Sequence, residues 1–303
     1  MAKFSTGIHK QFIICLALLL VPFITNNYAQ TNSDYELVSV KFEGNKVYSQ
    51  SELEKVIISK ESPGVFSQFL YSFTSFGAEA IYYNPGLVKS DIAQLKTFYR
   101  DRGFFKSRIT SQINVDSTDN DTELTYSIEA GDPAVVKKYT ISGLDNIFPD
   151  FLEMIHDRIT IETGEQYSAE VVNQTRAVVL NFLGDRGYMT VTSGAPEILV
   201  DTLKNEVEIS LNFIPGNRFK ISELRVVKSG AGKEEVTDQL LLDLIDIKEG
   251  DYYSNEKIQL SQIRLYRTNL FNSALIMPVR EDTLNNTVPL EILTNVSKIY
   301  QIT

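Results

Sequence analysis

Few residues of this chain could take part in covalent or metal chemistry. The 303 residues include two histidines, His9 and His156, and a single cysteine, Cys15. A zinc site or a Ser-His-Asp triad would have to use His156, but no cysteine or second histidine follows residue 30 and no serine lies in a G-x-S-x-G motif. The acidic pair Glu234-Glu235 indicates a solvated surface. We therefore predict that the chain is not an enzyme and holds no metal.

The balance of charge argues against nucleic acid as a partner. The formal net charge is -10 at pH 7, and it becomes -12 without Lys3 and Lys10. Phosphate binding requires a basic face, and a negative balance of this size does not favour one. There is also no G-x-x-x-x-G-K and no G-x-G-x-x-G motif. We expect no nucleic acid, no nucleotide and no cofactor.

The first 30 residues resemble a secretory signal peptide. Lys3 and Lys10 precede an apolar run from Phe12 to Ile24, which is too short for a stable transmembrane helix. Cleavage is expected near Ala29-Gln30, and a retained membrane anchor is the alternative. Cys15 lies inside the apolar run, which argues against lipidation. The exported part then has no cysteine, as expected for the Gram-negative envelope.

One stretch of the chain occurs twice. Residues 159–170 and 245–256 share the pattern I-x-I-x-x-G-x-x-Y-S-x-E at an offset of 86 residues. A repeat of this kind implies a module of roughly 85 residues that is used more than once. Gly164 and Gly250 are expected to turn the chain between two helices, and Ser168 and Ser254 to cap the second of them. Tandem modules favour a binding or spacing role over catalysis.

Each module shows the order strand, helix, helix, strand, strand. In the first module, Val38, Val40 and Phe42 alternate with polar residues, as in a half-buried strand. Ser49-x-x-Glu52 is a capping box, and Asn84-Pro85 opens the second helix. The second helix is expected to end at Gly103, Gly187 and Leu270 in the three modules. Leu270 breaks the glycine pattern, so either the helix exit differs or the alignment slips by one residue.

The chain accordingly divides into a leader, three modules and a short end. The expected boundaries are 1–30 for the signal peptide, 31–134 for the first module, 135–217 for the second, 218–297 for the third, and 298–303 for the start of a further region. The first module carries an insertion, 64–83, that is rich in aromatic residues.

The module resembles the POTRA domain. Val40-Lys-Phe-Glu-Gly-Asn45 is similar to the family's first strand, and the helix exit from Asp91 to Phe105 is similar to its D-x-x-x-L-x-x-x-Y-x-x-x-G-[FY] motif. Residues 161–167 and 247–253 are similar to its x-x-G-x-x-[FY] turn. The resemblance implies an α+β fold of tandem β-α-α-β-β modules, each a three-stranded mixed sheet with two helices on one face.

The three modules together resemble the periplasmic part of BamA/TamA-like outer-membrane assembly factors. This resemblance implies an exported protein at the periplasmic face of the bacterial outer membrane, with unfolded outer-membrane proteins and accessory proteins as partners. Two-partner secretion transport and a soluble periplasmic scaffold are the alternatives. The family continues into a membrane barrel, which this sequence lacks, so we expect either a fragment of a longer protein or a free-standing set of modules.

The resemblance also implies a binding mode. A three-stranded sheet has two edges to which an extended client strand can add by backbone pairing. In the resembling family the second strand of each module is an edge, which points here to Ser107–Val115, Met189–Val200 and Ala274–Arg280. The predicted client-binding residues are Ile109, Ser111, Ile113, Val191, Ala274 and Ile276.

The aromatic insertion is a second candidate surface. Phe66, Phe69, Phe73 and Phe76 are predicted to contact a membrane or a partner, since exposed apolar patches usually mark interaction sites. The alternative is a long loop packed over its own module.

Overall fold

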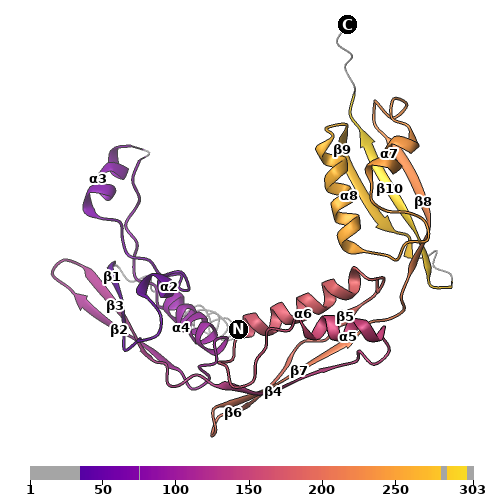
Figure 1. Ribbon diagram of the computed structural model, residues 1–303. Helices are drawn as coiled ribbons and strands as arrows, with labels where there is room; N and C mark the ends of the chain where they lie inside the picture. Colours follow the sequence, from indigo (N-terminus) through magenta and orange to yellow (C-terminus); the bar gives the residue numbers. More distant parts are fainter. Residues whose placement is uncertain (1–34, 75, 281–284, 299–303) are drawn as a thin grey trace, which may run out of the picture. The chain divides into compact units, whose positions relative to one another are not determined.

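The computed structural model describes residues 35–74, 76–280 and 285–298. Residues 1–30, which resemble a signal peptide, lie outside this part of the chain. Residues 35–41, 58–91 and 112–125 form one compact unit, and residues 42–57, 92–111 and the chain from Tyr126 onward form the other. The strands and helices follow the predicted order three times, with an extra helix in the insertion of the first module and a divided second strand in the second module (Figure 1).

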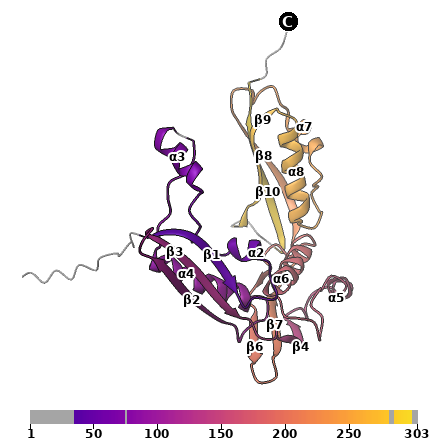
Figure 2. The same cartoon turned by 90° about the vertical axis from the view of Figure 1, so that its left-hand side faces the viewer.

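The first module begins with a strand, which capped helices follow. Its elements are β1 (Glu36–Glu43), α2 (Gln50–Glu54), α3 (Val65–Phe73), α4 (Pro85–Arg100), β2 (Arg108–Asp116) and β3 (Asp121–Glu129). The capping box of Ser49 and Glu52 is present, and the Asn84 side chain accepts the Gly86 N–H at the start of α4. The sheet order is β1-β3-β2, so the last strand is central (Figure 2).

The second module repeats this plan with a divided second strand. Its elements are β4 (Val135–Ser142), α5 (Pro149–His156), α6 (Ala169–Gly184), β5 (Thr192–Ser193), β6 (Glu197–Asp201) and β7 (Glu206–Ile214). Gly194, Ala195 and Pro196 interrupt the second strand, and both pieces pair with β7. β4 pairs with β7 in parallel, while β5 and β6 are antiparallel to it. The predicted mixed sheet is therefore confirmed.

The third module has the same topology. Its elements are β8 (Lys220–Ser229), α7 (Asp238–Leu244), α8 (Asn255–Arg267), β9 (Phe271–Pro278) and β10 (Thr287–Val296). The order is β8-β10-β9, with β8 parallel and β9 antiparallel to β10. Helices α7 and α8 cover one face of this sheet (Figure 1). Within the described residues, no helix is long and apolar enough to span a bilayer.

The repeated stretch has the structural role expected of it. Gly164 and Gly250 have φ of 92° and 86°, a conformation that favours glycine, and they turn the chain between the helices. The hydroxyls of Ser168 and Ser254 accept N–H groups in the first turns of α6 and α8. The alternating residues of β7 and β10 pack beneath these helices, and each of the two modules has a buried core of its own.

The third helix exit differs from the other two. Gly103 and Gly187 have positive φ, whereas in the third module Asn269, one residue before Leu270, takes that conformation. The alignment itself does not slip. The carbonyl oxygens of Gly103, Gly187 and Leu270 all accept an N–H from the chain just beyond the last strand of their module, namely those of Ala134, Phe219 and Ser297.

Candidate binding groove of the second module

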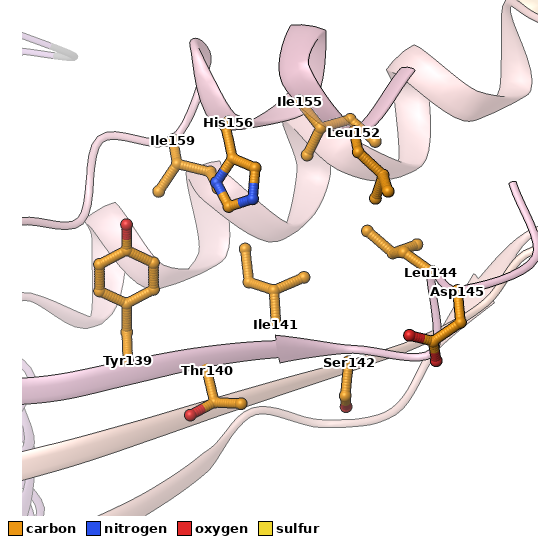
Figure 3. Close-up of a pocket in the computed structure, with 10 residues that line it drawn as sticks. All are labelled: Tyr139, Thr140, Ile141, Ser142, Leu144, Asp145, Leu152, Ile155, His156 and Ile159. Carbon is orange, nitrogen blue, oxygen red and sulfur yellow. The ribbon is translucent and has the colours of Figure 1, made fainter. Parts of the chain in front are cut away.

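An apolar groove lies between the first strand and the first helix of the second module. Its volume is about 420 Å³. The lining residues are Tyr139, Thr140, Ile141, Ser142, Leu144, Asp145, Leu152, Ile155, His156 and Ile159. Figure 3 shows Tyr139 and Ile141 pointing from β4 toward α5, whereas Thr140 and Ser142 point away from it. The groove therefore follows one edge of the sheet.

The β4 edge begins with a pair of backbone hydrogen bonds. Val136 donates its N–H to the Glu165 carbonyl at 2.8 Å and accepts the Gly164 N–H at 2.8 Å, so both groups point away from β7. The repeated stretch thus covers the start of this edge. Between Val136 and Lys138 the register with β7 shifts by a bulge.

Beyond the bulge the β4 edge is open. Along a strand, the lateral direction of the backbone groups alternates together with the side-chain face. Tyr139 and Ile141 pack on the same core as Val136, so their N–H and C=O groups also point away from β7. Across the described ranges, these groups make no hydrogen bond outside the sheet. The groove thus combines unpaired donors and acceptors with an apolar lining.

The corresponding edges of the other modules are more covered. In the first module, Val40 donates its N–H to the Glu61 carboxylate at 2.8 Å, and Ser62 and Ile81 pair with Leu37. In the third module, the Leu224 N–H lies 3.4 Å from the Glu249 carboxylate oxygen that accepts it. Thr163 stands at the position of Glu249 in the second module, at the 86-residue offset of the repeat. Because threonine is shorter and uncharged, it does not reproduce that contact.

The groove is lined mainly by apolar side chains. His156, on which any triad would depend, is exposed at the rim. Within the described ranges, no three His, Cys, Asp or Glu side chains are grouped so as to hold a metal. On the solvent face of β4, Lys137 donates to Glu208 at 2.8 Å, and this hydrogen bond is the main reason that the pKa of Lys137 is raised. Neither Lys137 nor Glu208 lines the groove.

The predicted client-binding residues of the first module lie on an edge strand. β2 has eight exposed side chains, and only Ile109 is buried. Ser111 and Ile113 are exposed, with Ile113 at 41%. The position of β2 at the sheet edge agrees with the expectation. Client binding along β2 stays a prediction.

The other predicted edges are less open. Val191 precedes β5 and is not in a strand, so the predicted strand Met189–Val200 begins later and is broken by Pro196. On β9, Ala274 and Ile276 are buried against the core of their own module. The Ile276 N–H donates to the Gln262 side chain of α8 at 2.7 Å, so this helix already occupies part of the β9 edge.

The aromatic insertion exposes its rings. Phe66, Phe69, Phe73 and Phe76 are 75%, 59%, 75% and 78% exposed. Helix α3 within it has no buried residue. The alternative of a loop packed over its module is wrong for these four side chains, because none of them is covered. A partner or membrane contact by these residues stays a prediction.

The sequence analysis did not identify the β4 groove. The resemblance to the POTRA family instead pointed to the second strand of each module as the client-binding edge. A local signal was present, because Tyr139 and Ile141 alternate with polar residues while Thr163 replaces the acidic residue of the third module. This pattern identifies an open sheet edge only when the hydrogen-bond partners of that edge are known.

Comparison with known proteins agrees with this fold. The BamA outer membrane protein assembly factor of Neisseria meningitidis serogroup B is 23% identical over 245 residues, which cover 78% of this chain and 28% of that protein. A putative outer membrane protein assembly factor of Treponema pallidum is 23% identical over 264 residues, covering 86% of this chain and 29% of that protein. The chain thus spans less than a third of the length of these relatives.

A solved structure and a family match lead to the same assignment. The crystal structure of Haemophilus influenzae BamA POTRA3-5 aligns with a TM-score of 0.51 and 18% identity, covering 87% of this chain and 96% of that one, which shows a shared fold. Residues 35–131 and 220–295, more than half of the chain, match the POTRA family, described as a surface antigen variable number repeat. The segment between them has the same element order. The chain belongs to the POTRA family.

Proposed function

We propose that this chain is the periplasmic POTRA region of an outer-membrane protein assembly factor, and that its second module binds unfolded client strands along β4. The observation that carries the client-binding proposal is the unpaired edge at Tyr139 and Ile141 beside the apolar groove. The names of the relatives support the assembly role. The chain would act outside the cytoplasm without a nucleotide, a cofactor or catalysis.

The chemistry of the groove matches an outer-membrane strand. Such strands alternate apolar and polar side chains over about 10 residues. Backbone pairing with Tyr139 and Ile141 is independent of sequence, and every second side chain of the client would enter the groove toward Ile155 and Ile159. The open edge is short, so each contact is weak. Further edges, with β2 the most exposed, would raise the effective concentration of sites on one chain.

A crosslinking experiment tests the site. Residues 31–303 contain no cysteine, so His156→Cys provides a single attachment point for a thiol-linked photocrosslinker at the groove. The probe is a peptide of about ten residues that alternates valine and threonine. We expect the peptide to be captured at this position. N-methylation of the peptide amides that face β4 should abolish capture, because it removes donors and leaves the side chains in place.

Two further positions serve as controls. Leu203→Cys places the same reagent on a side chain that is 94% exposed and outside the groove, and it should capture little peptide. Ile113→Cys reports on β2. Capture at Ile113→Cys without capture at His156→Cys would move the site to β2, and equal capture of the N-methylated peptide at His156→Cys would refute strand pairing.

A further inference from the structure

Helix α3 is amphipathic, but it exposes its apolar side, whereas an ordinary surface helix buries that side. Five of its nine residues form one apolar arc at helical spacing, namely Val65, Phe66, Phe69, Leu70 and Phe73. Val65 is 84% exposed, and the three phenylalanines are 59–75% exposed. The Phe69 and Phe73 rings lie 5.1 Å apart on this outer surface. The apolar side of α3 therefore faces solvent.

Contacts on the polar side of the helix hold it in this orientation. The Gln68 side-chain amide donates to the Glu36 carboxylate of β1 at 2.6 Å and to the Pro63 carbonyl at 2.8 Å. The returning chain crosses the same side, where Gly77 approaches the Ser67 carbonyl so closely that a Cβ would lie 2.2 Å from it. Gly77 has φ of 109°, which a side chain would also disfavour. Both contacts leave the apolar arc uncovered.

The base of the insertion is paired with the edge of the sheet. The Ser62 hydroxyl donates to the Ile81 carbonyl at 3.1 Å and accepts the Ile81 N–H at 2.8 Å. Leu37 of β1 donates its N–H to Ile81 and accepts that of Ser62, each at 2.8 Å. The helix is thus carried on a stem that is part of the folded module (Figure 2).

The exposed surface is wide and carries no charge. Residues 62–78 contain no Asp, Glu, Lys or Arg. Phe76, which is 78% exposed, extends the apolar area beyond the helix. A helix that docks in a protein groove presents a narrow stripe of anchors, whereas five apolar residues in nine, continued into the next turn, suit a broad uncharged surface.

We propose that α3 inserts its apolar side into the interface of a lipid bilayer with zwitterionic headgroups. Nine residues of helix are about 14 Å long, far short of the roughly 30 Å hydrocarbon core, so the helix would lie in the plane of the interface. With no basic residue on α3 and a net charge of -10 on the chain, attraction to anionic lipid contributes little. The contact is therefore insensitive to salt. It would attach the first module to a membrane independently of client binding at β4.

The test uses residues 31–303, which retain every described contact and exclude the apolar run of the leader. The chain has no tryptophan, so Phe69→Trp introduces a single reporter in the centre of the apolar arc. With phosphatidylcholine–phosphatidylethanolamine vesicles we expect a blue shift of the tryptophan emission and quenching by brominated lipid. Both signals should stay the same at about 0.5 M salt, where interactions between exposed charges are largely screened. The single substitutions Phe66→Ser and Phe73→Ser should each lower vesicle partitioning about tenfold.

A matched variant and four outcomes decide the proposal. Leu203→Trp places the reporter on another exposed apolar position and should show no shift. Equal shifts in both variants, or no shift for Phe69→Trp, would overturn the proposal. A concentration-dependent shift without vesicles would instead assign the surface to a second copy of the chain. A shift that disappears at high salt would contradict the proposal, because it would show that charge attraction holds the helix at the membrane. None of these outcomes affects peptide capture at His156→Cys.

Discussion

At the residue scale, a buried polar side chain on the second helix of the first and third modules accepts backbone N–H groups from the segment that follows the first helix. Asp91, Thr175 and Ser261 are buried at equivalent positions in α4, α6 and α8. The Asp91 carboxylate accepts the N–H groups of Ile58 and Ser59 at 2.6 and 3.2 Å, and the Ser261 hydroxyl accepts that of Asp246 at 3.1 Å. Buried N–H groups need such acceptors.

Asp91→Ala should lower the free energy of unfolding of the first module by about 3 kcal/mol, because it leaves two N–H groups without their acceptor. Ser261→Ala, which removes one neutral acceptor, should cost about 1 kcal/mol in the third module. Urea titration followed by circular dichroism measures both. Ser90→Ala, at an exposed neighbouring position, is the control. An equal loss for Asp91→Ala and Ser90→Ala would refute the assigned role.

Tyr99 should make the free energy of unfolding of the first module depend on pH in the alkaline range. Its hydroxyl donates to the Asn45 side chain at 2.9 Å, and burial, followed by the nearby Tyr48, raises the pKa of Tyr99 to about 12. The unfolded chain loses this proton near pH 10, so unfolding becomes easier between about pH 10 and about pH 12. In Tyr99→Phe the free energy of unfolding should fall less steeply across this window. Parallel curves for the two proteins would contradict this prediction.

At the element scale, sheet edges differ although the modules share one plan. The same first strand is covered by Glu61, Ser62 and Ile81 in the first module, is contacted by Glu249 in the third, and is open beyond Val136 in the second. A loop glutamate, Glu61 or Glu249, contacts this edge in the first and third modules, whereas the second module has Thr163 at the position of Glu249. If client strands bind along β4 as proposed, this difference gives tandem copies of one fold different binding capacities.

The insertion is the element that should contribute least to stability. Replacing residues 65–79 by a short glycine-serine linker removes α3 but keeps the paired stem of Ser62 and Ile81. Because α3 has no buried residue, the midpoint of thermal unfolding should change by no more than a few degrees. Differential scanning calorimetry gives this value. A large decrease would mean that α3 packs on the module, and it would also weaken the argument for a membrane contact.

At the scale of the whole molecule, the second and third modules have separate cores. One buried cluster is centred on β7 and α6, and the other on β10 and α8. Chains of this kind unfold module by module unless the contacts between neighbours are strong.

Leu290→Ala tests this separation. Leu290 is fully buried in β10, and its truncation should cost about 3 kcal/mol in the third module. Hydrogen exchange measured by mass spectrometry should accelerate in β8, β9 and β10 while β4 and β7 keep their protection. Leu203→Ala, at an exposed position, should change neither module. Equal loss of protection in both modules would show that they unfold as one cooperative unit.

The sequence by itself determined the repeat, the order of elements and most of their ends. Each of these features depends on local chemistry: Ser49, Ser168 and Ser254 cap helices with their own hydroxyls, and Gly164 and Gly250 turn the chain because they can adopt positive φ. Alternating apolar residues then assign the buried face of each strand.

Only the tertiary structure decided which surfaces are available. The partner of an edge N–H comes from a distant part of the chain, as when Gln262 reaches Ile276 or Glu61 reaches Val40. Likewise, the pattern of α3 defines an apolar side but not its direction, which is set by Glu36 and the return at Gly77. Local pattern specifies what an element can bury, whereas long-range contacts determine what it leaves exposed.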